Sequence, residues 1–282
     1  MEVLKSKTAL ITGASRGIGI YIAKALAREG MNLILVARNG EALKDVENEL
    51  SSLPISVSSI PADIGQRSQL MNLVDITETK FNGVDVLINN AGIELALPYA
   101  KIDPDIIDQI MEVNLRAPMI LTRLLLPKMI SRGEGHIVNI ASIAGLFGAP
   151  YEEAYAASKH GLIGFTRSLR FTALSEGYPI GASVISPGYI SEAGMYQDNI
   201  KNTTLKAPGS FGTSPPDDVA RAVIRAIKKN KSDIIVNSKP LRPLLALQSI
   251  APSITSWFAA KTGSLEFGKS FAQKNLKELS EK

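Results

Sequence analysis

Residues 8–30, TALITGASRGIGIYIAKALAREG, join an apolar strand-like run, a turn with Gly13, Gly17 and Gly19, and an amphipathic helical run. Glycines let backbone amides approach a pyrophosphate, and a helix N-terminus supplies unpaired N–H groups and a positive dipole end. The spacing departs from the common GxGxxG, so a turn that serves only chain reversal is the competing interpretation. We predict that this unit begins a parallel sheet and binds a dinucleotide at the turn.

The same alternation of strand and helix continues along the chain. Strand-like runs occupy 32–37, 55–62, 84–89, 134–142, 181–186 and 233–238, and helical runs end near Leu50, Lys80, Ile130 and Glu176. This pattern predicts a doubly wound, Rossmann-like α/β fold with helices on both faces of a parallel sheet. We expect one domain over residues 1–239. Residues 240–282 are expected to be an appended helical extension rather than an independent domain.

The composition restricts the class of protein. The 282 residues are 45% hydrophobic and carry 31 basic against 27 acidic side chains, a net charge of +4 that is too small and scattered to indicate nucleic acid. Without cysteine there is no disulfide or thiolate metal site, and two histidines lack paired-ligand spacing, so no metal is expected. No signal peptide or spanning apolar stretch is evident, which predicts a cytoplasmic protein.

The stretch 151–165, YEEAYAASKHGLIGF, places Tyr155 and Lys159 one helical turn apart on the same face. A nearby ammonium favours the phenolate and lowers the pKa of a tyrosine, which would make Tyr155 a usable proton donor. Ser142 ends the preceding strand, at the edge where open α/β sheets place their ligands. In isolation, the pair would more often be a half-buried aromatic and a solvated lysine.

These motifs together resemble the short-chain dehydrogenase/reductase family. The matching elements are TGASRGIG at 12–19, NNAG at 89–92, Asn114, Ser142, YAASK at 155–159 and PG at 187–188, in the family's usual order and spread over residues 5–236. The resemblance implies that Tyr155 is the general acid and that Ser142 polarises the substrate carbonyl. It also implies that Lys159 binds the nicotinamide ribose and that Asn114 holds a water. Without that context, Ser142 would be a turn former and Asn114 a helix residue satisfied by backbone.

The resemblance also implies a set of cofactor contacts. They fall at Gly13, Ser15, Arg16, Gly17, Ile18, Gly19, Arg38, Asp63, Ile64, Asn89, Asn90, Ala91, Gly92, Tyr155, Lys159, Pro187, Gly188 and Ile190. Asp63 has an equal alternative as a helix cap. The family often has threonine five residues after the proline of PG, whereas this chain has Glu192 beside Ser191, which leaves the contact with the carboxamide open.

The end of the second strand predicts the form of the cofactor. An acid there would bind the ribose of NAD and repel a 2′-phosphate, but Ala37 holds the position and Arg38 follows it. Arg16 in the glycine turn approaches from the other side, and guanidinium groups suit phosphate. We predict NADP (NADPH), against the alternative of two surface arginines with no partner.

The expected substrate region is apolar, with Leu146, Phe147, Tyr151, Met195 and Tyr196 as its lining. This predicts an NADPH-dependent carbonyl reductase or alcohol dehydrogenase acting on a lipophilic ketone, aldehyde or 3-oxoacyl small molecule. The alternatives are an epimerase or dehydratase on the same scaffold and a nucleotide-sensing protein without turnover. The family resemblance implies a homodimer or homotetramer.

Residues 240–260 lie beyond the resemblance and are apolar but interrupted by Arg242, Pro243, Gln248 and Pro252. Such interruptions argue against a spanning helix. Two interpretations remain: short helices that cap the pocket or contact another subunit, and an interfacial segment that makes peripheral membrane contact. We favour the first, because prolines break a continuous amphipathic helix.

Overall fold

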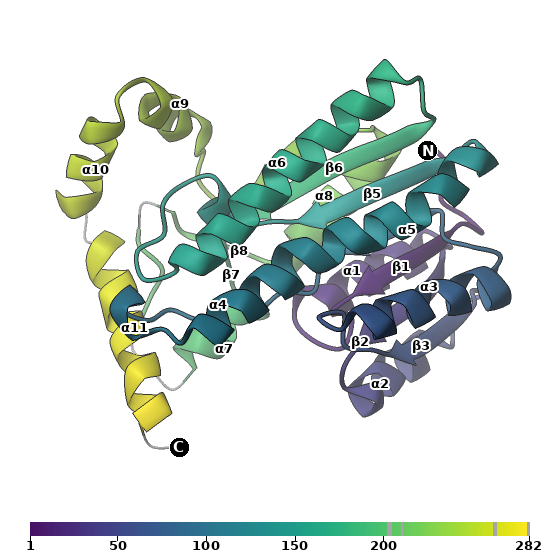
Figure 1. The fold of residues 1–282 in the computed structure, drawn as a ribbon, viewed down its shortest axis with the longest axis horizontal. Helices are drawn as coiled ribbons and strands as arrows, with labels where there is room; N and C mark the ends of the chain where they lie inside the picture. Colours follow the sequence, from purple (N-terminus) through teal and green to yellow (C-terminus); the bar gives the residue numbers. More distant parts are fainter. Residues whose placement is uncertain (202–204, 210, 262–263, 281–282) are drawn as a thin grey trace.

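A computed structural model describes residues 1–201, 205–209, 211–261 and 264–280. Its centre is a seven-stranded parallel sheet in the order β3-β2-β1-β4-β5-β6-β9 (Figure 1). The strands are β1 (Thr8–Thr12), β2 (Asn32–Ala37), β3 (Val57–Pro61), β4 (Val86–Asn89), β5 (Gly135–Ile140), β6 (Ile180–Pro187) and β9 (Asp233–Val236). β7 (Tyr189–Ile190) and β8 (Thr213–Ser214) form a separate short pair. The predicted α/β fold is confirmed.

Helices cover both faces of the sheet. On one face lie α1 (Ile18–Arg28), α2 (Gly40–Leu50) and α8 (Pro216–Lys228), and on the other α3 (Arg67–Phe81), α5 (Ala117–Arg132) and α6 (Glu153–Ser175). The remaining α-helices are α4 (Pro104–Met111), α7 (Met195–Ile200), α9 (Arg242–Ile250), α10 (Pro252–Lys261) and α11 (Ser264–Ser280). Coverage on both faces explains why central strands such as β1 and β5 are buried over nearly their whole length.

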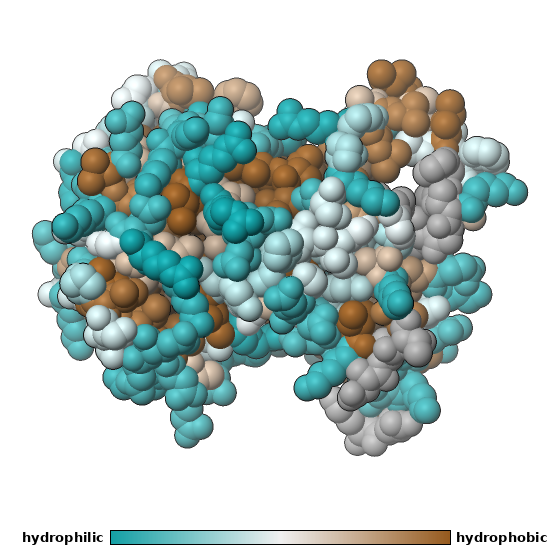
Figure 2. Space-filling view, turned by 180° about the vertical axis from the view of Figure 1, so that it is seen from behind, coloured by the Kyte–Doolittle hydropathy of each residue, from teal (hydrophilic) through white to brown (hydrophobic). Residues whose placement is uncertain are grey.

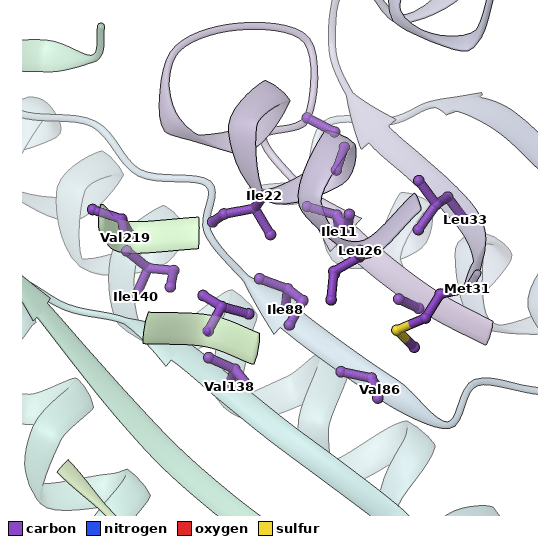
Figure 3. Packing of buried hydrophobic residues seen from close by; sticks show 14 of the residues in the cluster. Ile11, Ile22, Leu26, Met31, Leu33, Val86, Ile88, Val138, Ile140 and Val219 are labelled. Carbon is purple, nitrogen blue, oxygen red and sulfur yellow. The ribbon is translucent and has the colours of Figure 1, made fainter. Parts of the chain in front are cut away.

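The larger hydrophobic cluster lies between the sheet and helices α1, α2 and α8. Ile22 and Leu26 of α1 are fully buried against Ile11 and Ile88 of the sheet, as Figure 3 shows. Val219 of α8 extends the same cluster towards β5 and β6. This packing fixes the N-terminal end of α1 beside the carboxyl end of β1.

The strand order reverses at β1. The chain runs outward from β1 through β2 to β3 and then returns to place β4 on the other side of β1. Open parallel sheets bind their ligands at such a reversal, outside the carboxyl ends of the strands. The fold therefore puts the glycine turn, the NNAG motif and Ser142 at one edge of the sheet.

The continuous helix expected from Pro104 to Ile130 contains an irregular turn. α4 ends at Met111, a π-helical segment spans Glu112–Arg116, and α5 follows and continues to Arg132. Asn114 lies in the π segment and is fully buried. π turns widen the helix locally and often occur at functional sites, so the deviation coincides with a predicted site residue.

The C-terminal extension is helical, as expected. α9 and α10 pack against each other and stand away from the sheet, whereas α11 returns along the side of the molecule near α4 and α7 (Figure 1). Among the described residues, no helix has the length and apolarity needed to cross a membrane.

Candidate active site

A cavity of about 1610 Å³ opens at the carboxyl edge of the sheet. Its walls come from the glycine turn, the ends of β2, β4, β5 and β6, the start of α6, and the C-terminal helices. Drug-sized ligands commonly occupy pockets of about 300–1,000 Å³. The cavity therefore has room for a dinucleotide and a second molecule together.

The glycine turn is shaped for close approach. Gly13 and Gly17 have φ values of 67° and 60°, in the left-handed region that favours glycine. A Cβ on Gly13 would lie 2.8 Å from Ala91 Cα, and one on Gly19 would lie 2.1 Å from the Gly13 carbonyl oxygen. The turn thus holds the N-terminal end of α1 open towards the cavity, where a phosphate group fits its free N–H groups.

Ser142, Tyr155 and Lys159 meet on the cavity wall. Ser142 follows β5, and its hydroxyl accepts a hydrogen bond of 3.1 Å from the Ala144 N–H and is hydrogen-bonded to the Tyr155 hydroxyl. Lys159 Nζ donates to the Ile140 carbonyl at 3.0 Å and lies 5.6 Å from the centroid of the Tyr155 ring. Helix α6 therefore carries both the tyrosine and the lysine, and the end of β5 leads into the serine and holds the lysine ammonium.

Burial dominates the electrostatics of this group. It raises the pKa of Tyr155, and the nearby Glu94 raises it further, while the bond from Ser142 lowers it. Burial also lowers the pKa of Lys159 to about 8, against the opposing charge of Glu94. The expectation that Lys159 holds the Tyr155 pKa below its usual value is therefore not met in this structure, because desolvation and the charge of Glu94 raise that pKa.

Comparison with known proteins decides the family. Residues 7–203 match the short chain dehydrogenase family. The chain belongs to that family. It is thus a nucleotide-binding oxidoreductase with the Rossmann-like fold, and the resemblance drawn from its motifs is confirmed.

Several members of the short-chain dehydrogenase family are similar along most of their length. The chain is 40% identical over 287 residues to the ketoacyl reductase HetN of Nostoc sp., covering 99% of this chain and 96% of that protein. It is 34% identical to a dehydrogenase/reductase SDR family protein 7-like of Drosophila melanogaster, covering 92% and 81%.

Solved structures give the same result. A metagenomic short-chain oxidoreductase in complex with NADP is 30% identical, with a TM-score of 0.70 over 83% of this chain and 98% of that one. A variant of actinorhodin polyketide ketoreductase with NADPH is 28% identical, with a TM-score of 0.74 over 84% and 97%. A Burkholderia phymatum member in complex with NAD, 24% identical, shows the same fold with a TM-score of 0.78 over 90% and 96%.

Asn114 does not line the cavity, although it lies directly behind the wall. Its side-chain oxygen accepts from the Ile93 N–H at 2.8 Å, and its amide donates to the Ile93 carbonyl at 2.8 Å and to the Ser158 hydroxyl at 3.1 Å. The side chain is thus satisfied by backbone and by α6. It anchors the loop after NNAG against the helix of Tyr155, and its expected water contact stays a prediction.

The two asparagines of NNAG point in different directions. Asn89 is buried below the cavity, where its amide donates to Asn139 at 2.7 Å, and it is not among the lining residues. Asn90 lines the cavity, and its amide donates to the carbonyls of Thr12 at 3.0 Å and Gly13 at 3.1 Å. The side chain of Asn89 therefore does not reach the cavity where the ribose contact was expected. The hydrogen bonds of Asn90 instead stabilise the glycine turn.

The residues expected around the adenosine end mostly line the cavity. Arg38 is exposed at the rim with no ion pair among the described residues, whereas Arg16 forms an ion pair with Asp198 of α7. Asp63 lines the wall and accepts from the Gly65 N–H at 3.0 Å, and the N-cap of α3 is Gln66. Asp63 thus shapes a turn and does not cap that helix.

Most of the predicted cofactor residues surround this one cavity. The lining includes Gly13, Ser15, Arg16, Gly17, Ile18, Arg38, Asp63, Ile64, Asn90, Ala91, Gly92, Tyr155, Lys159, Pro187, Gly188 and Ile190. Gly19 lies outside and packs against the turn. Ser191 and Glu192 also lie outside the lining, and Ala193 and Gly194 take the adjacent wall. The side chains of Ser191 and Glu192 therefore do not face the cavity, where a contact with the carboxamide was left open.

The substrate side is partly as expected. Phe147, Met195 and Tyr196 line the cavity, but Leu146 packs into a small core cluster and Tyr151 lies outside the wall. Tyr189, which was not predicted, also lines the cavity, with its ring centroid 5.1 Å from that of Tyr196. The substrate side of the cavity is thus apolar, as predicted, although some of the residues that line it differ from those expected.

Two acidic residues that the sequence analysis missed also line the cavity. Glu94 accepts a hydrogen bond of 3.1 Å from the Asn199 amide, and burial raises its pKa to about 7 against the attraction of Lys159. Burial and the charge of Glu94 raise the pKa of Glu152 as well. No short sequence motif identifies Glu94 or Glu152 as a cavity residue. The two residues lie far apart in the sequence, and only the fold brings them close together.

Helix α11 supplies a second missed part of the wall. Phe267 stands 5.5 Å from Tyr189 between ring centroids, and Phe271, one turn later, is buried. Lys274 and Asn275 then donate to the carbonyls of Asn199 at 2.6 Å and Ala96 at 3.0 Å. The phenylalanines four residues apart were a readable signal of a helix with one buried face.

Proposed function

We propose that this protein is an NADPH-dependent carbonyl reductase whose substrate is a lipophilic ketone, aldehyde or 3-oxoacyl compound. The observation that carries the proposal is the Ser142–Tyr155 hydroxyl pair beside Lys159 on the wall of a cavity large enough for cofactor and substrate. Similarity to a ketoacyl reductase and to a polyketide ketoreductase with NADPH supports the same reaction class.

The residues present fit a dinucleotide. The glycine turn leaves a cradle that a Cβ would fill, since a Cβ on Gly13 would lie 2.8 Å from Ala91 Cα. Ala37 holds the position where an acid would disfavour a 2′-phosphate, and Arg38, which has no ion pair in the part of the chain that the structure describes, follows it on the cavity wall; this supports NADP over NAD. When bound, the reduced nicotinamide supplies the hydride.

The protein's own residues would manage the proton. With a raised pKa, Tyr155 stays protonated at neutral pH and holds the proton that a carbonyl oxygen needs. Ser142 is placed to donate a hydrogen bond to the same oxygen. Lys159, with a pKa of about 8, is mostly charged at neutral pH and would stabilise the phenolate left behind.

The outer part of the cavity supports a lipophilic substrate. Phe147, Tyr189 and Phe267 contribute aromatic surface there, and Phe147 and Phe211 meet edge to face at 6.1 Å. Aromatic walls stabilise apolar ligands by burial and exclude water from the reacting carbonyl.

A panel of ketones, aldehydes and 3-oxoacyl thioesters, assayed by the loss of NADPH absorbance, tests this proposal. We expect turnover to increase with the apolar length of the substrate and to be faster with NADPH than with NADH. Binding of NADPH with no turnover on the whole panel would favour a nucleotide-sensing protein. Exchange of substrate hydrogen without net oxidation of cofactor would favour an epimerase.

A further inference from the structure

The hairpin of α9 and α10, residues 242–261, carries an exposed apolar face. Leu247 and Ile250 lie three residues apart on α9, and Ile254 and Trp257 lie three apart on α10. Their exposed fractions are 40%, 83%, 54% and 62%. Residues at that spacing share a helix face, and Figure 2 shows apolar residues gathering over the α9 end of this projection. Contiguous exposed apolar surface of this kind marks an interaction site.

Other residues of the same hairpin line the mouth of the active-site cavity. Leu244 and Gln248 of α9 and Thr255 and Ser256 of α10 line it. The hairpin otherwise packs on itself and on α11, away from the sheet (Figure 1). An occupant of the exposed face would therefore lie next to the entrance to the cavity.

The charged residues of the hairpin and of the residues next to it in the sequence are all cations. From residue 239 to residue 265 the chain has three cations, Lys239, Arg242 and Lys261, and no acidic residue. All three are exposed. Arg242 begins α9 and Lys261 ends α10, whereas Lys239 Nζ donates to the Gly209 carbonyl. Two cations on an apolar hairpin complement a surface that is anionic at its edge and apolar beneath, as an anionic lipid bilayer is. An exposed tryptophan suits the interfacial layer of such a bilayer.

We propose that the α9–α10 hairpin binds the surface of an anionic lipid bilayer. Ile250, Ile254 and Trp257 enter the interfacial layer, and the cations of the hairpin pair with lipid phosphates. The mouth of the cavity, which other residues of the same hairpin line, then lies beside the lipid surface. This binding does not depend on the reaction proposed above. It adds a membrane contact to the pocket-capping role favoured from the sequence, because the break at Pro252 yields two short helices that each expose apolar side chains.

The test uses the full chain and vesicles of phosphatidylcholine with or without phosphatidylglycerol. Trp257 is the only tryptophan, so its emission reports on the hairpin alone. We expect co-sedimentation with the anionic vesicles, a blue shift of the emission, and loss of binding at high salt. The double variant Ile250→Ser, Ile254→Ser should bind at least about tenfold more weakly, since two apolar side chains no longer enter the lipid.

The matched control is Val3→Ser with Met71→Ser, two exposed apolar residues outside the hairpin, which should bind vesicles like the unmodified protein. Both double variants should keep their turnover of a short water-soluble carbonyl, since none of the four residues lines the cavity. Equal vesicle binding by the unmodified protein and the hairpin variant would overturn the proposal. So would no vesicle binding, equal binding to neutral vesicles, or a dimer that already buries Trp257 without lipid.

Discussion

At the scale of residues, a few side chains decide the chemistry, and burial acts on them more strongly than their neighbours do. Tyr155 and Lys159 are 7% and 3% exposed, and desolvation is the largest cause of the pKa shift of each. Both shifts favour the neutral form. The site therefore keeps a protonated acid beside a cation that still carries its charge near neutral pH.

We propose that Ala37 and Arg38 determine the choice between NADPH and NADH. Ala37→Asp combined with Arg38→Gln should weaken NADPH binding about tenfold or more, because a charge-assisted phosphate contact contributes about 1.5–3 kcal/mol and the new carboxylate repels the phosphate. Dissociation constants for NADPH and NADH, measured by fluorescence titration, check this. Ala37→Asn is the matched control without the charge and should retain most of the preference. Equal affinity of the unmodified protein for both cofactors would contradict the assignment.

Glu94 should make stability depend on pH. Its pKa in the fold is about 7, above the ordinary 4.5, so the native state binds more protons than the unfolded state in that interval and stability falls as pH rises through it. Glu152 acts in the same direction, whereas Lys159 attracts Glu94 and opposes the effect. In the unmodified protein the free energy of unfolding should fall by an amount on the order of 1–3 kcal/mol as pH rises through this range, and Glu94→Gln should remove that fall. Urea unfolding across the pH range, without cofactor, measures it. Parallel pH profiles for the variant and the unmodified protein would refute this role.

At the scale of elements, helix α11 forms one wall of the substrate side of the cavity, and Gly268 lets it pack closely against the loop at Pro150. A Cβ on Gly268 would lie 2.9 Å from the Pro150 carbonyl oxygen, so Gly268→Ala should push the helix and its Phe267 outward. KM for a lipophilic substrate should rise about fivefold, the equivalent of about 1 kcal/mol, with kcat on a small substrate nearly unchanged. Gly164→Ala in α6 is the control, since its Cβ meets open space and alanine favours a helix. An equal KM in both variants would show that α11 does not shape the pocket.

Elements with strong local patterns were predictable from the sequence. The strands, the glycine turn and the order of Ser142, Tyr155 and Lys159 follow from apolar periodicity and helix spacing. The side of Asn89 was readable too, since strand residues alternate and Asn89 and Asn90 must point to opposite faces. The positions of Glu94 and Glu152 were not, because only the tertiary fold brings the loop after NNAG to the start of α6.

At the scale of the whole molecule, the sheet and the C-terminal extension have separate tasks. Neither of the two large hydrophobic clusters contains a residue after Val236. Truncation after Ser238 should therefore leave a folded, soluble protein with a nearly unchanged urea midpoint. KM for lipophilic substrates should increase, because Phe267 and Phe271 leave the wall. Aggregation or unfolding of the truncated chain would contradict the division at residue 239, which stays a prediction.

The measurement that tests the central claim most directly is NADPH oxidation by the unmodified protein and by Tyr155→Phe, on the best substrate of the carbonyl panel. The substitution deletes the proton donor and little else, so turnover should fall by about 10²–10⁴. The dissociation constant for NADPH, measured separately, should stay within about threefold. A kcat for Tyr155→Phe close to that of the unmodified protein would contradict the assignment of Tyr155 as the acid, and with it the mechanism proposed for this site.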